Sequence, residues 1–118
     1  MRLIVNFRTW LLALLAFTGA VVAETPLDPH LIQALKTGHL RTCLPNVSFQ
    51  LESAGLASNP QKVANMYCHC LGNFYFNDLS KEEFEEMRIS DGALPARIAQ
   101  NRRAIQEHCA TIHLPHFR

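Results

Sequence analysis

The fold of this chain is decided by residues 59–76, which read NPQKVANMYCHCLGNFYF. Asn59 followed by Pro60 is a typical helix start, because asparagine caps free amides and proline suits the first helical turn. Apolar residues then recur with the period of a helix, and they share one predicted face: Val63, Met66, Tyr67, Cys70, Leu71 and Phe74. We therefore expect a central helix over roughly residues 59–76 that buries this face.

Two cysteines, Cys68 and Cys70, lie inside this predicted helix. They point about 200° apart around its axis, so they do not pair with each other unless the helix unwinds. Cys43 precedes the helix and Cys109 follows it. An even number of cysteines in a small exported chain is typical of disulfides, so we expect each central cysteine to bind one of the outer two. The spacing leaves open whether the pairs are 43–68 with 70–109, or 43–70 with 68–109.

The first 23 residues are typical of a secretory signal peptide. Two arginines flank its start, residues 10–17 are apolar, and Val21 and Ala23 are the small residues that precede a cleavage point. Cleavage before Glu24 leaves 95 of the 118 residues, with nine Lys and Arg against ten Asp and Glu. The alternative is an uncleaved anchor, although the apolar part is short for a bilayer. We expect a periplasmic or secreted protein without a membrane span after cleavage, and its near-neutral charge argues against nucleic-acid binding.

A helix is also predicted before the central one. Asp28 and Pro29 form its start signal, and Gly38 is a weak point within it. We expect this helix to continue to about Pro45, where proline is typical of an end. Residues 46–57 are ambiguous between a helical turn and a packed loop.

After the central helix, Ser80 and Glu83 have the spacing of a capping box. Leu79 and Phe84 stand at the two positions of a hydrophobic staple around it. This pattern predicts a short helix that ends near Ile89, before Ser-Asp-Gly.

A last helix is predicted from one apolar stripe: Leu94, Ile98, Ile105, Cys109 and Ile112. We expect one helical domain over residues 24–112 and a flexible tail at 113–118. No long stretch alternates with the period of a strand. The sequence therefore predicts an all-α, disulfide-stapled bundle of about four helices, in which the central helix is cross-linked to an N-terminal and a C-terminal helix.

The cysteine pattern, with Tyr67-Cys68-His69-Cys70 in the central helix and the Ser80 helix start after it, resembles that of small exported proteobacterial proteins. The resemblance covers most of the chain after the leader. It implies a helical fold and a periplasmic location, and it carries over no catalytic or binding residue.

Metal binding is one candidate activity. His108, His113 and His116 crowd the C-terminus, and we consider a periplasmic copper- or zinc-binding protein as the alternative function. The Cys68-His69-Cys70 cluster favours disulfides over metal binding, because its sulfurs point apart and export favours oxidation. No thioredoxin-like pattern surrounds it, and no catalytic constellation is present, so we expect no enzyme and no cofactor.

Protein binding is the other candidate, and it is our main expectation. Residues 78–91 hold six acids and two bases, whereas residues 97–118 hold four arginines and one acid. Such a bipolar surface suits a protein partner in the cell envelope, and exposed aromatic residues are also enriched at interfaces. We expect an accessory subunit, inhibitor or immunity-type protein. Of the Phe74-Tyr75-Phe76 run we expect Phe74 to be buried, and Tyr75 or Phe76 to pack on a second element or be exposed. The candidate partner surface comprises Tyr75, Phe76, Glu82, Glu85, Glu86, Arg102 and Arg103.

Overall fold

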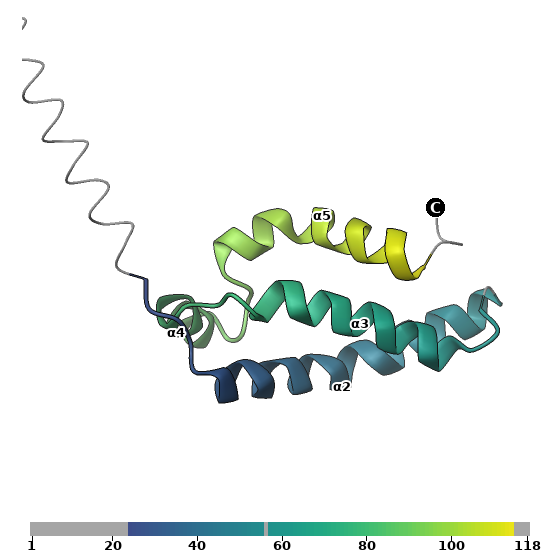
Figure 1. Ribbon diagram of the computed structural model, residues 1–118, viewed down its shortest axis with the longest axis horizontal. Helices are drawn as coiled ribbons and strands as arrows, with labels where there is room; N and C mark the ends of the chain where they lie inside the picture. Colours follow the sequence, from purple (N-terminus) through teal and green to yellow (C-terminus); the bar gives the residue numbers. More distant parts are fainter. Residues whose placement is uncertain (1–23, 56, 115–118) are drawn as a thin grey trace, which may run out of the picture.

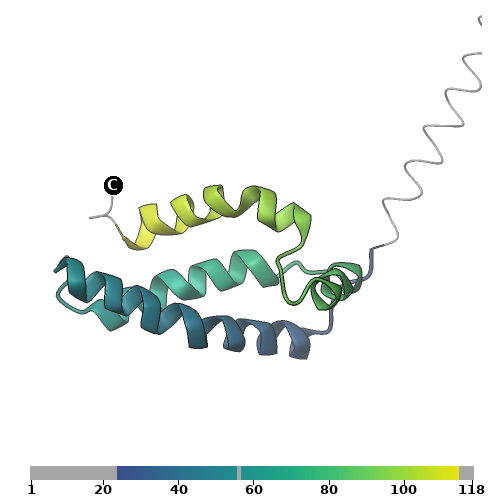
Figure 2. The same cartoon turned by 180° about the vertical axis from the view of Figure 1, so that it is seen from behind.

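A computed structural model describes residues 24–55 and 57–114; the predicted leader at 1–23 lies outside the described residues. It contains the helices α2 (Pro29–Ala54), α3 (Pro60–Phe76), α4 (Lys81–Ile89) and α5 (Ala96–His113). In Figure 1, α3 lies between α2 and α5 and packs against both. Figure 2 shows the same order from behind, with the short α4 at one end. The predicted all-α bundle with a central helix is confirmed.

The predicted helix starts are confirmed by their hydrogen bonds. The Asp28 carboxylate accepts from the amide of His30 at 2.8 Å, and the Asn59 side chain accepts from the amide of Lys62 at 3.2 Å. At α4 the Ser80 hydroxyl accepts from the Glu83 amide, while the Glu83 carboxylate accepts from the Ser80 amide. These caps satisfy amides that a helix leaves without internal partners.

The first helix is longer than predicted. α2 continues through Pro45 to Ala54, so the expected end at Pro45 is wrong, and most of the ambiguous segment is helical. A proline inside a helix costs about 3 kcal/mol, but a buried face beyond it offsets that cost. Leu51 is buried there, and Val47 packs against the same cluster. α2 ends at Gly55, whose left-handed φ of 65° suits glycine.

The core consists of two apolar clusters. The larger one lies toward α4, and its buried members are Leu27, Leu71, Tyr75, Phe76, Leu79, Met87, Ile98 and Cys109. The smaller one lies between α2 and α3 with the residue that follows α5, and its buried members are Leu51, Ala64 and Leu114. Because α3 contributes to both clusters, it is the helix on which the other elements are assembled.

The buried face of α3 differs from the predicted one. Met66 and Phe74 are exposed, at 47% and 48%, although the sequence pattern places them in the core. Cys68, which is not among the residues of the predicted face, is fully buried, and Gly72 lies under His39. α3 packs on two helices, so its buried arc is rotated toward α2 relative to the apolar stripe.

The end of α5 also differs in detail. Ile98 and Cys109 are buried as predicted, but Ile112 is 55% exposed. His113 is the last residue of α5, and Leu114 is buried in the smaller cluster. Helix α5 thus ends one residue beyond position 112, and residues 115–118 lie outside the described part.

Candidate functional site

Both disulfides connect α3 to a neighbouring helix. Cys43 pairs with Cys68, which joins α2 to α3, and Cys70 pairs with Cys109, which joins α3 to α5. This decides between the two pairings that the spacing left open. In each bond the Cα atoms lie 5.9 or 5.8 Å apart, within the usual range. Because no cysteine is free, the sulfurs offer neither a metal site nor a reactive thiol.

A half-buried histidine lies beside the first disulfide. His39 Nε2 donates to the Cys68 carbonyl oxygen at 3.2 Å, since a carbonyl only accepts. Its ring contacts Tyr75 and Phe76 edge to face, with centroids 5.8 and 5.9 Å apart. A Cβ at Gly72 would lie 3.3 Å from this ring, so glycine allows α2 and α3 to approach here.

Burial lowers the pKa of His39 below its ordinary value of 6.5 and outweighs the hydrogen bond to the Cys68 carbonyl, which raises it; the nearby His69 acts in the same direction as burial. The unfolded chain therefore binds a proton that the folded chain resists. We expect the free energy of unfolding to be largest above pH 6.5 and to fall as the pH drops below it, with a slope under about 1.4 kcal/mol per pH unit. Urea unfolding of wild type and of His39→Gln across this range tests the prediction. The variant should lose the slope, whereas the exposed control His30→Gln should keep it; equal slopes in all three would refute the assignment.

Tyr75 and Phe76 are not a partner surface. Both are buried in the larger cluster, so their assignment to an exposed surface is wrong and their role is a second core contact. The Tyr75 hydroxyl has no hydrogen-bond partner among the described residues. Leaving such a group unpaired costs about 1–3 kcal/mol, which the burial of the ring offsets. Phe74, the member of the run predicted to be buried, is the exposed one.

The acids of α4 mostly have partners within the chain. Glu82 accepts from the Thr25 amide at 3.3 Å, and Glu86 accepts from the Ala96 amide at 3.4 Å, close to the start of α5. Glu85 lies 3.3 Å from Arg88 in an exposed pair, which contributes little. All three are exposed, yet their bonds hold the ends of neighbouring elements in place.

Glu83 forms the strongest ion pair of this region. Its two carboxylate oxygens accept from Nε and Nη2 of Arg97 at 2.9 and 3.0 Å. This bidentate contact lowers the pKa of Glu83 and raises that of Arg97. It ties α4 to the first turn of α5. Arg102 and Arg103, the predicted basic half of the partner surface, are exposed further along α5.

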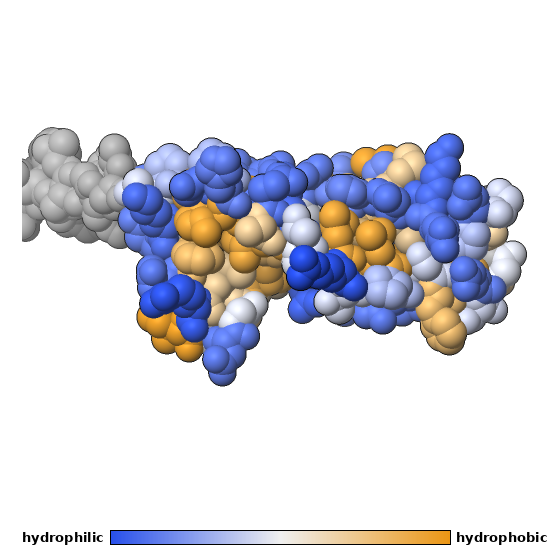
Figure 3. Space-filling model, turned by 90° about the horizontal axis from the view of Figure 1, so that it is seen from below, coloured by the Kyte–Doolittle hydropathy of each residue, from blue (hydrophilic) through white to orange (hydrophobic). Residues whose placement is uncertain are grey.

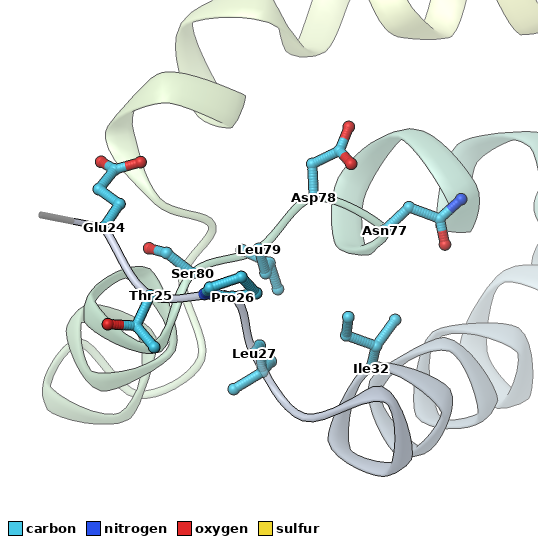
Figure 4. Close-up of a pocket in the computed structure, with 9 residues that line it drawn as sticks. All are labelled: Glu24, Thr25, Pro26, Leu27, Ile32, Asn77, Asp78, Leu79 and Ser80. Carbon is cyan, nitrogen blue, oxygen red and sulfur yellow. The ribbon is translucent and has the colours of Figure 1, made fainter. Parts of the chain in front are cut away.

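The segment after the predicted leader is part of the fold. The Leu27 amide donates to the Leu79 carbonyl at 3.1 Å, and the Lys81 amide donates to the Thr25 carbonyl at 2.8 Å. A pocket of about 300 Å³ lies beside these hydrogen bonds, and its lining includes the apolar Leu27 and the acids Glu24 and Asp78 (Figure 4). Both carboxylates help to raise the pKa of the nearby Arg97, so they belong to the same charge network.

An exposed apolar surface lies where α3 meets α5. Met66, Cys70 and Phe74 are each four residues apart on α3 and share one face. The Phe74 ring contacts His108 of α5 edge to face, with centroids 5.2 Å apart, and Ile112 follows His108 by one turn. Because α3 and α5 run in opposite directions (Figure 1), the bond from Cys70 to Cys109 sets these residues in register. We call these five residues the α3–α5 strip.

The strip differs from the other exposed apolar residues in lying on two helices that a disulfide and a ring contact join. On α2, Leu31 and Phe49 are exposed about 27 Å apart along the helix. Figure 3, which views the molecule from below Figure 1, shows that this face also carries apolar areas, with hydrophilic residues between them. Grouped exposed apolar side chains mark interaction sites more often than single ones do. The signal for the strip was present in the sequence, since α3 has more large apolar residues than one buried arc can hold.

The histidines proposed for metal binding do not form a site in the described part of the chain. His108 lies against Phe74, His113 ends α5, and His116 lies outside the described residues. Within residues 24–55 and 57–114, no group of three or more His, Cys, Asp or Glu side chains is placed to hold a metal ion. The copper or zinc function therefore gains no support from this geometry.

No family model, no curated protein and no solved structure matches this chain. Among the described residues, no helix combines the length and the apolar character that crossing a bilayer needs. Two disulfides fit an oxidising compartment. Within the described residues, the α3–α5 strip is held by the Cys70–Cys109 bond between its two helices.

Proposed function

We propose that this chain is an exported, non-enzymatic protein-binding module that docks a partner in the cell envelope through the α3–α5 strip. The observation that carries the proposal is that Met66, Phe74 and Ile112 are each about half exposed on two helices joined by a disulfide. Exposing these side chains costs solvation free energy that a partner would recover by covering them. The leader pattern and the resemblance to small exported proteobacterial proteins support a periplasmic location.

Helices α3 and α5 suit this role because two contacts hold them in place. The Cys70 to Cys109 bond fixes the spacing of α3 and α5, and the Glu83 to Arg97 pair anchors the start of α5. A preformed surface loses little conformational entropy on binding, which raises the affinity that a small apolar area supplies. An accessory subunit, an inhibitor and an immunity-type protein all require such a surface.

Site-specific photo-crosslinking in the producing cell tests the proposal. The full chain is expressed with a photoreactive residue at Ile112 or, as the matched control, at Phe49, which is 68% exposed on α2. We expect a discrete crosslinked partner from position 112 and none of that mass from position 49. Adding Phe74→Ser should weaken the crosslink at least about tenfold, since buried aromatic residues dominate interfaces.

The protein purified for this experiment also tests location. Its mass should show a chain that begins at Glu24 and carries both disulfides. Thermal melts of the variants establish that they fold. Identical crosslinks from positions 112 and 49, or a crosslink unaffected by Phe74→Ser, would refute docking at the strip.

A further inference from the structure

The helices that carry the strip are basic. α3 and α5 together contain Lys62, Arg97, Arg102 and Arg103, and all four are exposed. Glu107 is their single Asp or Glu, and α3 has none. Lys62 precedes Met66 by one turn, so its ammonium group lies on the helix surface next to the strip. The strip thus has Lys62 beside one end, and Arg102 and Arg103 add positive charge to the exposed surface of α5.

Three acids of α4 are bonded within the chain, whereas Glu107 lies on α5 one turn after Arg103. The carboxylates of Glu82, Glu83 and Glu86 are bonded to Thr25, to Ser80 and Arg97, and to Ala96 around α4. Of the four bases, Arg97 has an ion pair in the described part of the chain, with Glu83. The other three are free to act on an approaching molecule.

We propose, building on the function above, that the occupant of the strip is an acidic amphipathic helix of a partner protein. Met66 and Phe74 lie eight residues apart on α3, which is about 12 Å, or two helical turns. A helix with apolar residues at every third or fourth position presents a matching row. Carboxylates on the flanks of that helix meet Lys62 and the field of Arg102 and Arg103, which gives orientation and speeds association.

A second copy of this chain fits the strip less well. The acidic helix that the chain itself exposes is α4, and Ile89 at its end is 83% exposed. The other large apolar residues of α4, Phe84 and Met87, pack into the larger cluster, so α4 offers one apolar contact to a strip that needs several. Two strips placed face to face would oppose their bases, including Lys62, and like charges repel.

Two designed peptide helices test the inference with the intact mature protein. Both carry leucine along one face and are constrained to be helical; one has glutamate on its flanks and the other lysine. We expect the acidic peptide to bind at least about tenfold more tightly at low salt, and its affinity to fall as salt rises. Fluorescence anisotropy of labelled peptide measures both affinities.

Matched variants separate the apolar and the charged contributions. Phe74→Ser should abolish binding of the acidic peptide, whereas Phe49→Ser should not change it. Lys62→Glu should weaken that binding about fivefold, whereas Arg41→Glu on α2 should change it by less than about twofold, because distant surface charges are screened.

The outcomes distinguish this inference from the proposed function. Equal binding of the two peptides, both sensitive to Phe74→Ser, would overturn the acidic partner while leaving docking at the strip intact. Equal effects of Phe74→Ser and Phe49→Ser would overturn both. Sedimentation that shows a dimer in wild type and a monomer in Phe74→Ser would identify a second copy as the occupant and overturn the acidic helix.

Discussion

Reduction of both disulfides should unfold the helical domain, with loss of its helical circular dichroism at neutral pH. The bonds close loops of 25 and 39 residues, and on a chain-entropy basis they contribute up to about 3.5 and 4 kcal/mol. A domain of this size has a net stability of about 5–15 kcal/mol, so the two bonds supply a large share of it. Urea titrations of the mature protein with and without reductant measure the difference; an unchanged midpoint would contradict the prediction.

The two bonds should not be equivalent. α2 and α3 share the more extensive helix–helix contact, and the contact between α3 and α5 is smaller. Replacing Cys70 and Cys109 by alanine should therefore release α5, with faster amide hydrogen exchange there than in α2. The matched pair of replacements, at Cys43 and Cys68, should lower stability and leave the exchange rates of α5 relative to α3 nearly unchanged. Equal loss of protection in α5 from both pairs would refute this asymmetry.

The parts of the fold that the sequence predicts are those fixed by neighbouring residues. A cap and its amide lie within three positions of each other, so Asp28, Asn59 and Ser80 mark their helices without any tertiary information. The exclusion of a bond between Cys68 and Cys70 is equally local, because it depends on helix geometry alone. The choice between the two remaining pairings depends on how α2 and α5 approach α3, which the spacing does not encode.

The wrong predictions have a tertiary cause. Pro45 is tolerated inside α2 because Leu51 beyond it is buried against Ala64 of α3, a contact between residues distant in sequence. The sequence pattern places Met66 and Phe74 in the core, because an apolar stripe along a helix is normally buried. With a helix on either side, α3 buries Cys68 and Tyr75 instead, and its excess apolar residues become the strip.

The sequence predicts which residue types the candidate site contains, but not where these residues lie in the fold. The segregation of acids and bases along the chain is visible in the sequence, and the basic helix α5 is where it was expected. The sequence places the acids on the same partner surface as the bases. Nothing local indicates that Glu82 and Glu86 accept hydrogen bonds from the amides of Thr25 and Ala96. Bonds of this kind appear only when separate elements are brought together.

Leu79→Ala should be the most damaging single apolar truncation, lowering the free energy of unfolding by about 3 kcal/mol. Leu79 is 2% exposed and stands just before the cap of α4. Its side chain belongs to the larger cluster, its amide donates to Phe76, and its carbonyl accepts from Leu27. One residue thus connects the end of α3, the start of α4 and the segment that precedes α2. Urea unfolding measures the loss, and Ile89→Ala, at an 83% exposed residue of α4, is the control expected to stay within about 0.5 kcal/mol.

The double variant with Leu27→Ala tests whether the segment after the predicted leader acts with Leu79. Leu27 is buried in the same cluster and lies three residues beyond Glu24. Residues that share a cavity and a hydrogen bond usually couple by at least about 0.5 kcal/mol, so the two losses should not add. Strict additivity would mean that Leu27 and Leu79 stabilise the fold independently of each other. Coupling would mean that the two side chains act together in the larger cluster, to which the segment before α2 then belongs.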